Sequence, residues 1–364
     1  MKAGVVTFIA YAVAFSFLSG TLFSQTSTLD SDIIQLLQLN HVPSVSIARI
    51  TDGKITLLRA YGQQDVTTAA TPRTLYNIAS LTKPITAQVA MRLLSQGTFS
   101  LDEPMAPVWT DPDIATDDRR TLLTPRIALT HQTGFANWRS MTNNKLTFQF
   151  TPGTRYSYSG EGFEYLAHFM EKKTGVALDV NAKKLIFDPL GMHDTAFTYQ
   201  PWFQGRVASP ADGKGVWVAP SFADHPISAD MVYTTANDYA LLLQAVMENR
   251  GISAQIAHER DTLQVDLKEE ICSKLPANLC PDAAGSGLSW QILRFKDTTI
   301  LMHTGHDPGL FTFAYLSPTT RDGVVILTNG ENGRKLVPTI LRDLNAPAAL
   351  TEALSAGFKS AGFK

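Results

Sequence analysis

A serine and a lysine three residues apart, Ser80 and Lys83, form the only Ser-x-x-Lys in the sequence. Apolar residues recur at four-residue steps from Ile85 to Leu93, which predicts a helix. Pro84 must lie in the first turn of that helix, where backbone amides have no intrahelical partner. We therefore expect Ser80 at or next to the helix N-cap, with the Lys83 amine on the same face and within its reach. A hydroxyl beside an amine that burial can deprotonate is what an activated serine nucleophile requires.

The same tetrapeptide also has a structural interpretation. Serine is a favoured N-cap residue, and an exposed lysine one turn later is ordinary helix surface. A short motif does not separate the two interpretations, so the rest of the chain has to supply partners for Ser80 and Lys83.

Composition limits the classes of function. The chain has 364 residues, of which 44% are hydrophobic, and its formal net charge is −2. This length suits one large domain or two moderate ones. Charged residues are dispersed, without a basic stripe or an aromatic-interleaved cluster, so we expect no nucleic-acid partner.

The first residues have the architecture of an export signal. Lys2 is followed by an almost wholly apolar run to Leu18 and then by small residues. We expect a signal peptide over residues 1–24 and an exported protein, periplasmic or secreted, without stable membrane insertion after cleavage. An uncleaved membrane anchor is the alternative, although the run is short for a spanning helix. Cys272 and Cys280 lie close together, and in an oxidising compartment they can form a local disulfide; two free thiols are the alternative.

The elements that must position the site come from both ends of the chain. Asp52-Gly53 between two apolar runs predicts a β-hairpin. Four short β-rich segments between residues 289 and 328 predict further strands, and a helix is expected over residues 335–344. We expect an α/β (α+β) chain: an antiparallel sheet from residues 25–79 and 286–345, and an inserted, mostly helical lobe over residues 80–285. Residues 346–364 read as a C-terminal tail.

Two further motifs join Ser80 and Lys83. Tyr158-Ser159-Gly160 follows Pro-Gly-Thr, and His303-Thr304-Gly305 lies on a predicted strand. In this order and at these spacings the chain resembles the serine β-lactamase and penicillin-binding protein superfamily, in particular its branch of class C β-lactamases, D,D-peptidases and family VIII esterases. The resemblance runs from about residue 30 to residue 340. It implies a β-lactamase/transpeptidase-like fold and a reaction that needs no cofactor or metal.

The resemblance also implies roles for single residues. Ser80 is the expected nucleophile that forms an acyl-enzyme, with Lys83 as its base or proton partner. Tyr158 is expected to move the proton between Ser80, the leaving group and water. The backbone N–H groups of Ser80 and His306 are the expected oxyanion hole. For Tyr158 taken alone, a core tyrosine is the alternative.

Two departures from the family pattern concern the substrate. Gly160 stands where the family usually has asparagine, so the contact of that amide with the substrate's acylamino carbonyl is missing. His303 replaces the usual lysine, and a neutral histidine anchors a carboxylate less well than an ammonium. A strand histidine whose hydrogen bonds are satisfied within the fold is the alternative for His303. His303, His306 and Asp307 could also suggest a metal site, but in an extended or turn conformation their side chains need not converge.

We therefore expect an exported, monomeric serine hydrolase that acts on a small-molecule or peptide substrate through an acyl-serine. D-amino-acid peptides, small esters and β-lactams are the candidate substrates, and Gly160 and His303 disfavour a dedicated β-lactamase. The alternatives are a carboxylesterase, a true β-lactamase, and a non-catalytic penicillin- or peptidoglycan-binding module.

Overall fold

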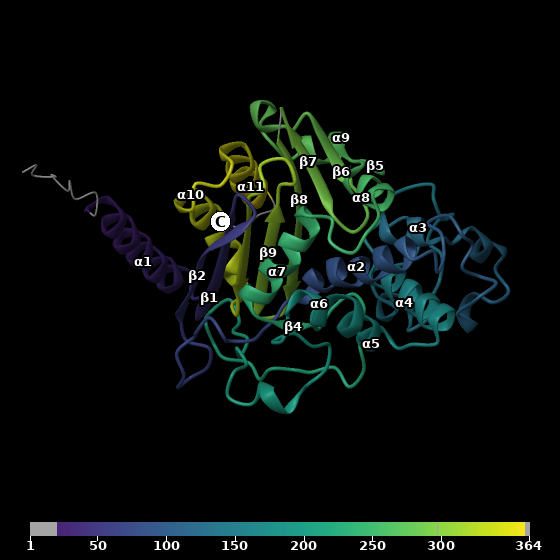
Figure 1. Ribbon diagram of the computed structural model, residues 1–364, viewed down its shortest axis with the longest axis horizontal. Helices are drawn as coiled ribbons and strands as arrows, with labels where there is room; N and C mark the ends of the chain where they lie inside the picture. The colour runs from purple at the N-terminus through teal and green to yellow at the C-terminus, as the bar shows by residue number, and fades with distance from the viewer. Residues whose placement is uncertain (1–19, 297, 361–364) are drawn as a thin grey trace, which may run out of the picture.

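An eight-stranded antiparallel sheet forms the centre of the protein, whose computed structural model describes residues 20–296 and 298–360 (Figure 1). The strand order is β2-β1-β10-β9-β8-β7-β6-β5. The strands are β1 (Ser44–Thr51), β2 (Lys54–Gly62), β5 (Val265–Asp266), β6 (Ala283–Ser286), β7 (Gln291–Phe295), β8 (Thr298–Asp307), β9 (Leu310–Leu316) and β10 (Gly323–Thr328). A separate pair, β3 (Tyr76–Asn77) and β4 (Tyr233–Thr234), lies beside the Ser80 turn.

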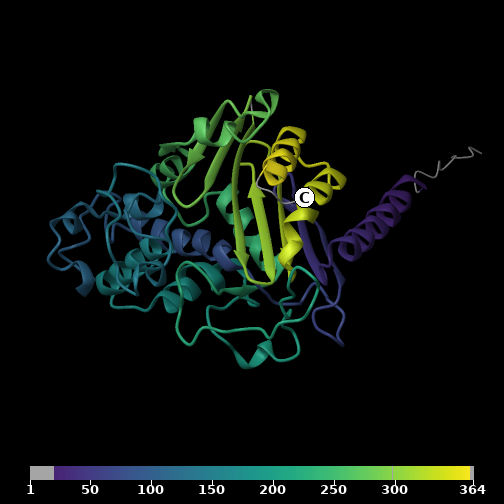
Figure 2. The same cartoon turned by 180° about the vertical axis from the view of Figure 1, so that it is seen from behind.

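Helices cover both faces of this sheet (Figures 1 and 2). Alternate residues of β9 enter different cores, Ala314 and Leu316 on one face, Phe313 and Tyr315 on the other. The first core is shared with α2 (Thr82–Ser95), α3 (Pro125–Leu129), α4 (Gly160–Thr174), α5 (Leu178–Ala182), α6 (Asp188–Leu190), α7 (Ala236–Met247) and α8 (Ala254–Asp261). The second is shared with α1 (Gly20–Asn40), α9 (Lys268–Cys272), α10 (Val337–Asp343) and α11 (Ala348–Ser360). Because both faces are covered, the central strands β9 and β10 are buried along their whole length.

The predicted architecture is confirmed. Asp52 and Gly53 join β1 to β2 with φ of 50° and 74°, the left-handed conformation that a two-residue hairpin turn requires. β1 then pairs with β10, so that strands from the two ends of the chain are neighbours in one sheet. The helical insertion returns to the sheet earlier than expected, at Val265 rather than near residue 286, because short β5 and β6 extend the edge beyond β7.

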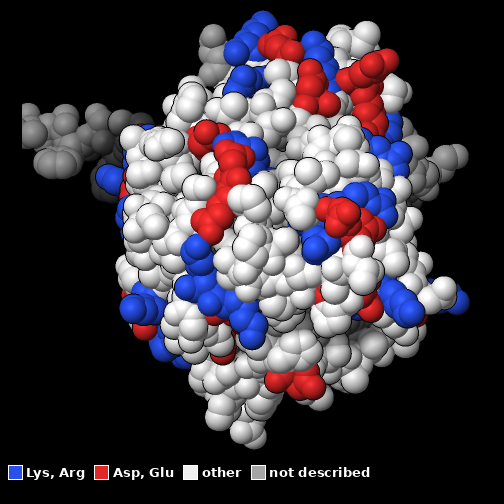
Figure 3. All heavy atoms as spheres, turned by 90° about the vertical axis from the view of Figure 1, so that its right-hand side faces the viewer, with Lys and Arg blue, Asp and Glu red and all other residues white. Residues whose placement is uncertain are grey.

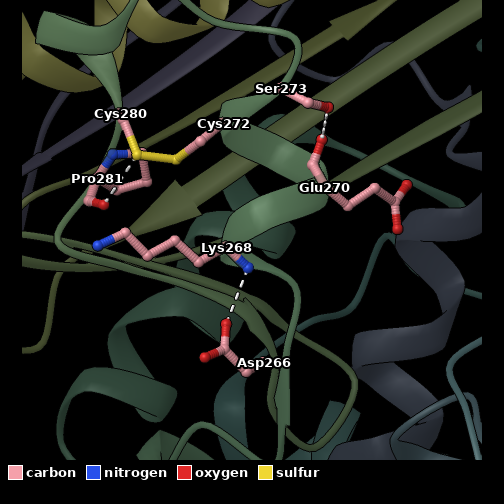
Figure 4. Close-up of a disulfide and its surroundings, with 7 residues drawn as sticks. All are labelled: Asp266, Lys268, Glu270, Cys272, Ser273, Cys280 and Pro281. Carbon is pink, nitrogen blue, oxygen red and sulfur yellow. Dashed lines mark hydrogen bonds between the residues drawn. A yellow bond between two sulfur atoms is a disulfide. The ribbon is translucent and has the colours of Figure 1, made fainter.

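The expected disulfide is present. Cys272 and Cys280 are joined over a sequence separation of eight residues. Figure 4 shows that the bond ties the end of α9 to the segment that leads into β6. The 268–280 excursion is therefore fixed at both its ends beside the sheet.

Two predictions concern the ends of the chain, the signal segment and the C-terminal tail. Of the predicted signal segment, residues 1–19 lie outside the described residues, and Gly20–Ser24 belong to α1. Within residues 20–296 and 298–360, no helix is long and apolar enough to cross a membrane. Residues 348–360, read from the sequence as tail, form α11 instead, because Leu350, Leu354 and Phe358 recur every fourth residue and pack onto the second core.

This packing makes α11 part of the fold, so we expect Leu350→Ala to destabilise the whole domain. Leu350 is fully buried, so its truncation should lower the free energy of unfolding by about 2–4 kcal/mol. Glu352→Ala, at an exposed position of the same helix, is the matched control and should change stability by less than about 0.5 kcal/mol. Urea unfolding measures both, and equal stability of the two variants would show that α11 is not part of the cooperative unit.

Candidate active site

A cavity of about 430 Å³ opens above the Ser80 turn, at the boundary between the sheet and the helical lobe. Five of the predicted site residues line it: Ser80, Tyr158, His303, Thr304 and His306. The structure therefore brings together side chains from three segments that lie more than seventy residues apart in the sequence.

The backbone around Ser80 is strained. Ser80 lies in a 3₁₀ turn (Ala79–Leu81) directly before α2, and the hydroxyl caps nothing, since the residue at the N-cap of α2 is Leu81. Ala79 has φ of 45°, a conformation that non-glycine residues rarely adopt, and its N–H donates to Asn77 Oδ1 at 2.8 Å. Ser80 is thus held at the end of a constrained turn, and the capping interpretation of this serine does not apply.

Lys83 lies one turn after Ser80 and is fully buried. Its Nζ donates to Ser80 Oγ at 2.9 Å and to the carbonyl of Ala229 at 2.9 Å. Nζ also lies 4.7 Å from the centre of the Tyr158 ring. Burial lowers the pKa of Lys83 to about 8, against the opposing effect of nearby carboxylates. At pH 7 roughly a tenth of the protein then carries a neutral amine at this position.

Three carboxyl groups lie near Lys83, Glu164, Asp230 and Asp307, and none of them was predicted to be its neighbour. Glu164 accepts hydrogen bonds from Ser228 Oγ at 2.8 Å and from the Ala229 N–H at 3.2 Å, and so fixes the carbonyl to which Lys83 donates. Asp230 and Asp307 hydrogen-bond each other. Burial raises the pKa of Glu164 and of Asp230, and burial together with Asp230 raises that of Asp307 to about 7. These raised values limit the negative charge beside Lys83, which keeps the neutral amine accessible.

Tyr158 lies against both Lys83 and His131. Its ring is 4.3 Å from that of His131, whose Nδ1 accepts the N–H of Ser159 at 3.1 Å. His131 is buried, and burial holds its pKa well below the usual range, so it stays a neutral acceptor. Burial raises the pKa of Tyr158, against the effect of its hydrogen bond with Ser80, so the phenol is protonated at neutral pH.

His303 faces Tyr158 across the cavity, with ring centres 6.2 Å apart. Its Nδ1 contacts the carbonyl of Thr304 at 2.7 Å. Burial first, and the charge of Lys83 second, lower the pKa of His303 to about 3. His303 is therefore neutral at pH 7, and it offers no positive charge to a substrate carboxylate.

Gly305 lets β8 approach the Ser80 turn. A Cβ at this position would lie 2.2 Å from the carbonyl oxygen of Ile78 and 2.3 Å from Thr312 Oγ1. Thr312 Oγ1 also donates to that carbonyl at 2.9 Å, which joins β9 to the turn. Pairing of β7 with β8 ends at Met302, so the edge of β8 beyond it faces the cavity rather than another strand. His306, at the end of this edge, is exposed and lies 3.5 Å from Glu331.

Gly160 does not line the cavity, which corrects its expected place among the substrate-binding residues. It is the first residue of α4, and its N–H is held by the backbone and side-chain oxygens of Asn137, at 3.0 and 2.8 Å. A Cβ here would lie 2.8 Å from the Trp138 ring. Trp138 occupies the space into which a longer side chain would extend, while Asn137 lines the cavity. Glu161 next to it is paired with Arg139 at 2.8 Å.

The likeness to known proteins extends over most of the chain. The Beta-lactamase family profile matches residues 29–346. The chain belongs to the beta-lactamase family. It is a serine hydrolase of this superfamily, with a β-lactamase/transpeptidase fold.

Relatives in the family carry different activities in their names. The chain is 23% identical over 308 residues to the D-alanyl-D-alanine-carboxypeptidase/endopeptidase AmpH of Escherichia coli K12, covering 76% of this chain and 77% of AmpH. It is 26% identical over 284 residues to the esterase EstB of Burkholderia gladioli, covering 63% and 71%. The octameric penicillin-binding protein homologue of Pyrococcus abyssi superposes with a TM-score of 0.74 at 23% identity, covering 90% and 79%.

The packing around Gly160 predicts the effect of restoring the family's asparagine. Gly160→Asn must displace the Trp138 ring, and overpacking of this kind costs about 1–3 kcal/mol of stability. We expect a lower melting temperature and no gain in acylation by penicillins or D-amino-acid peptides. In a Trp138→Ala background, where the ring is absent, Gly160→Asn should cost less stability than it does in the wild type. A single variant as stable as the wild type and faster in acylation would contradict this account.

Proposed function

We propose that Ser80 is the nucleophile of an exported acyl-serine hydrolase, with Lys83 as its base. The contact that carries the proposal is the 2.9 Å hydrogen bond between Lys83 Nζ and Ser80 Oγ in a site where Lys83 is fully buried. A neutral amine accepts the Ser80 proton as Oγ attacks the substrate carbonyl.

The remaining residues complete the reaction. The N–H groups of Ser80 and His306 are proposed to bind the carbonyl oxygen as it gains negative charge. Tyr158, protonated at neutral pH, gives its proton to the leaving alkoxide or amine, and Lys83 returns the proton of Ser80 to Tyr158. An acyl-Ser80 ester and the free alcohol or amine result. Water then attacks the ester while Tyr158 takes one proton from it and passes its own proton to neutral Lys83. Lys83 gives that proton to Ser80 Oγ as the acyl bond breaks and the carboxylic acid leaves.

The substrate end of the cavity supports small esters, and amides of D-amino acids without a free carboxylate, rather than β-lactams, which carry one. Gly160 has no side-chain amide to contact an acylamino carbonyl, and the Trp138 ring fills the space into which a longer side chain would extend. His303 is neutral, so a carboxylate finds no ammonium there. The names of AmpH and EstB, a carboxypeptidase and an esterase, support the same two substrate classes.

The export signal and domain limits remain proposals. We propose that residues 1–24 are removed, that residues 25–345 with α11 form one hydrolase domain, and that the protein works as a monomer on small or peptide substrates. On the face shown in Figure 3, positive and negative side chains are interspersed, which gives no support to a nucleic-acid partner.

A labelling experiment tests the proposed function. The protein from residue 25 onward is incubated with a fluorophosphonate, p-nitrophenyl acetate, a D-Ala-D-Ala peptide and nitrocefin, and its intact mass is followed. We expect one fluorophosphonate adduct, ester turnover, and neither in Ser80→Ala. Lys83→Met should lower the acylation rate by about a hundredfold or more, because it removes the base. An unlabelled wild-type protein would favour the non-catalytic binding module.

A further inference from the structure

A second cavity, of about 670 Å³, lies on the α11 side of the sheet. The two cavities adjoin, since five residues line both this cavity and the one at Ser80: Ile271, Lys274, Gln291, Met302 and Thr304. The second cavity is the larger and holds none of the residues assigned to chemistry above, apart from Thr304 at its mouth.

The lining of this cavity changes with depth. Polar groups stand at the shared mouth, whereas the deeper wall is apolar and comes from three elements. These apolar residues are Leu275 of the disulfide-closed excursion, Leu293 and Phe295 of β7, and Leu354 and Phe358 of α11. Among the described residues that line its interior beyond the shared mouth, none carries a charge, so the cavity suits a hydrocarbon group better than a peptide or a sugar.

The walls of the cavity are held in place on both sides. The bond between Cys272 and Cys280 fixes the excursion that supplies Leu275 (Figure 4). α11 supplies another wall, and among the described residues a Cβ at its Gly357 would meet Leu275 Cδ2, at 3.6 Å. This is ordinary van der Waals contact, so a larger side chain at position 357 extends into the cavity rather than into backbone.

The position of the mouth relates the cavity to one end of the substrate. On the proposed function, Tyr158 protonates the leaving atom, so the group attached to that atom lies on the Tyr158 side of Ser80. His303 faces Tyr158, and the mouth begins at its neighbours Met302 and Thr304. The acyl chain is bonded to the carbonyl carbon and not to the leaving atom, so it lies on the other side of the scissile bond.

We propose that the second cavity binds an apolar arm of the leaving group, so that the preferred substrates are esters or amides of hydrophobic alcohols or amines. This inference rests on the proposed function and names a substrate class for it. Each methylene buried in such a cavity raises kcat/KM by up to about fourfold.

Two ester series and two variants test the proposal. Butyl and octyl acetate vary the leaving group, and p-nitrophenyl acetate and octanoate vary the acyl group. We expect kcat/KM of the wild type to rise at least tenfold from butyl to octyl acetate, and not between the p-nitrophenyl esters. Gly357→Phe should abolish the octyl advantage and leave butyl acetate turnover unchanged. Glu352→Phe, an aromatic at an exposed position of the same helix, should behave as the wild type.

The results that overturn the proposal are distinct from those that overturn the serine mechanism. Equal rates for butyl and octyl acetate, or an octyl preference that survives Gly357→Phe, would overturn the subsite. A preference for the octanoyl ester would place the arm on the acyl side and overturn it equally. Calorimetric titration of the Ser80→Ala variant with octanol measures binding to the cavity without catalysis. Octanol binding that is lost when Gly357→Phe is added supports the subsite even if no ester is turned over. Absence of octanol binding contradicts it.

The chain's own last residues are the other candidate occupant. A variant that ends at Ser360 tests this alternative when its octyl preference is compared with that of the full chain. An octyl preference equal to that of the full chain supports substrate as the occupant, whereas a preference that arises only after the truncation overturns it.

Discussion

The burial of Lys83 is the constraint on which the rest of the site depends. An ammonium without solvent is costly, and the chain meets this cost by lowering the pKa rather than by pairing the charge with one carboxylate. Lys83 Nζ instead contacts a hydroxyl and a carbonyl, and the carbonyl is fixed by Glu164. Any movement of α2, α4 or the 228–230 segment therefore changes the chemistry at Ser80.

A second constraint brings the sheet to this buried amine. β8 can lie against the Ser80 turn only because Gly305 lacks a side chain, and Thr312 on β9 hydrogen-bonds the same turn. The far C-terminal strands and the early Ser80 turn thus form one rigid cleft wall. The free edge of β8 results from the end of its pairing with β7 at Met302, and the same end of pairing opens the mouth of the apolar cavity.

Local features of this arrangement could be predicted from the sequence, and tertiary ones could not. Helical spacing placed Lys83 beside Ser80, and Asp52-Gly53 marked the hairpin, because both depend only on neighbours in the chain. Glu164, Asp230 and Asp307 come from three distant segments, and no spacing relates them to Lys83. The same is true of Trp138, which fills the space beside Gly160. α11 was predicted as tail although its apolar residues recur every fourth position, because its stability depends on packing against the second core, which no local spacing specifies.

The pH dependence of Ser80 acylation by a fluorophosphonate tests the central claim most directly, since this reagent does not titrate in the range used. If Lys83 acts as a neutral base with its pKa near 8, the rate rises about tenfold per pH unit below that value and levels off above it. A rate that is constant between pH 6 and 9, or that continues to rise past pH 10 as for an exposed lysine, would contradict the account.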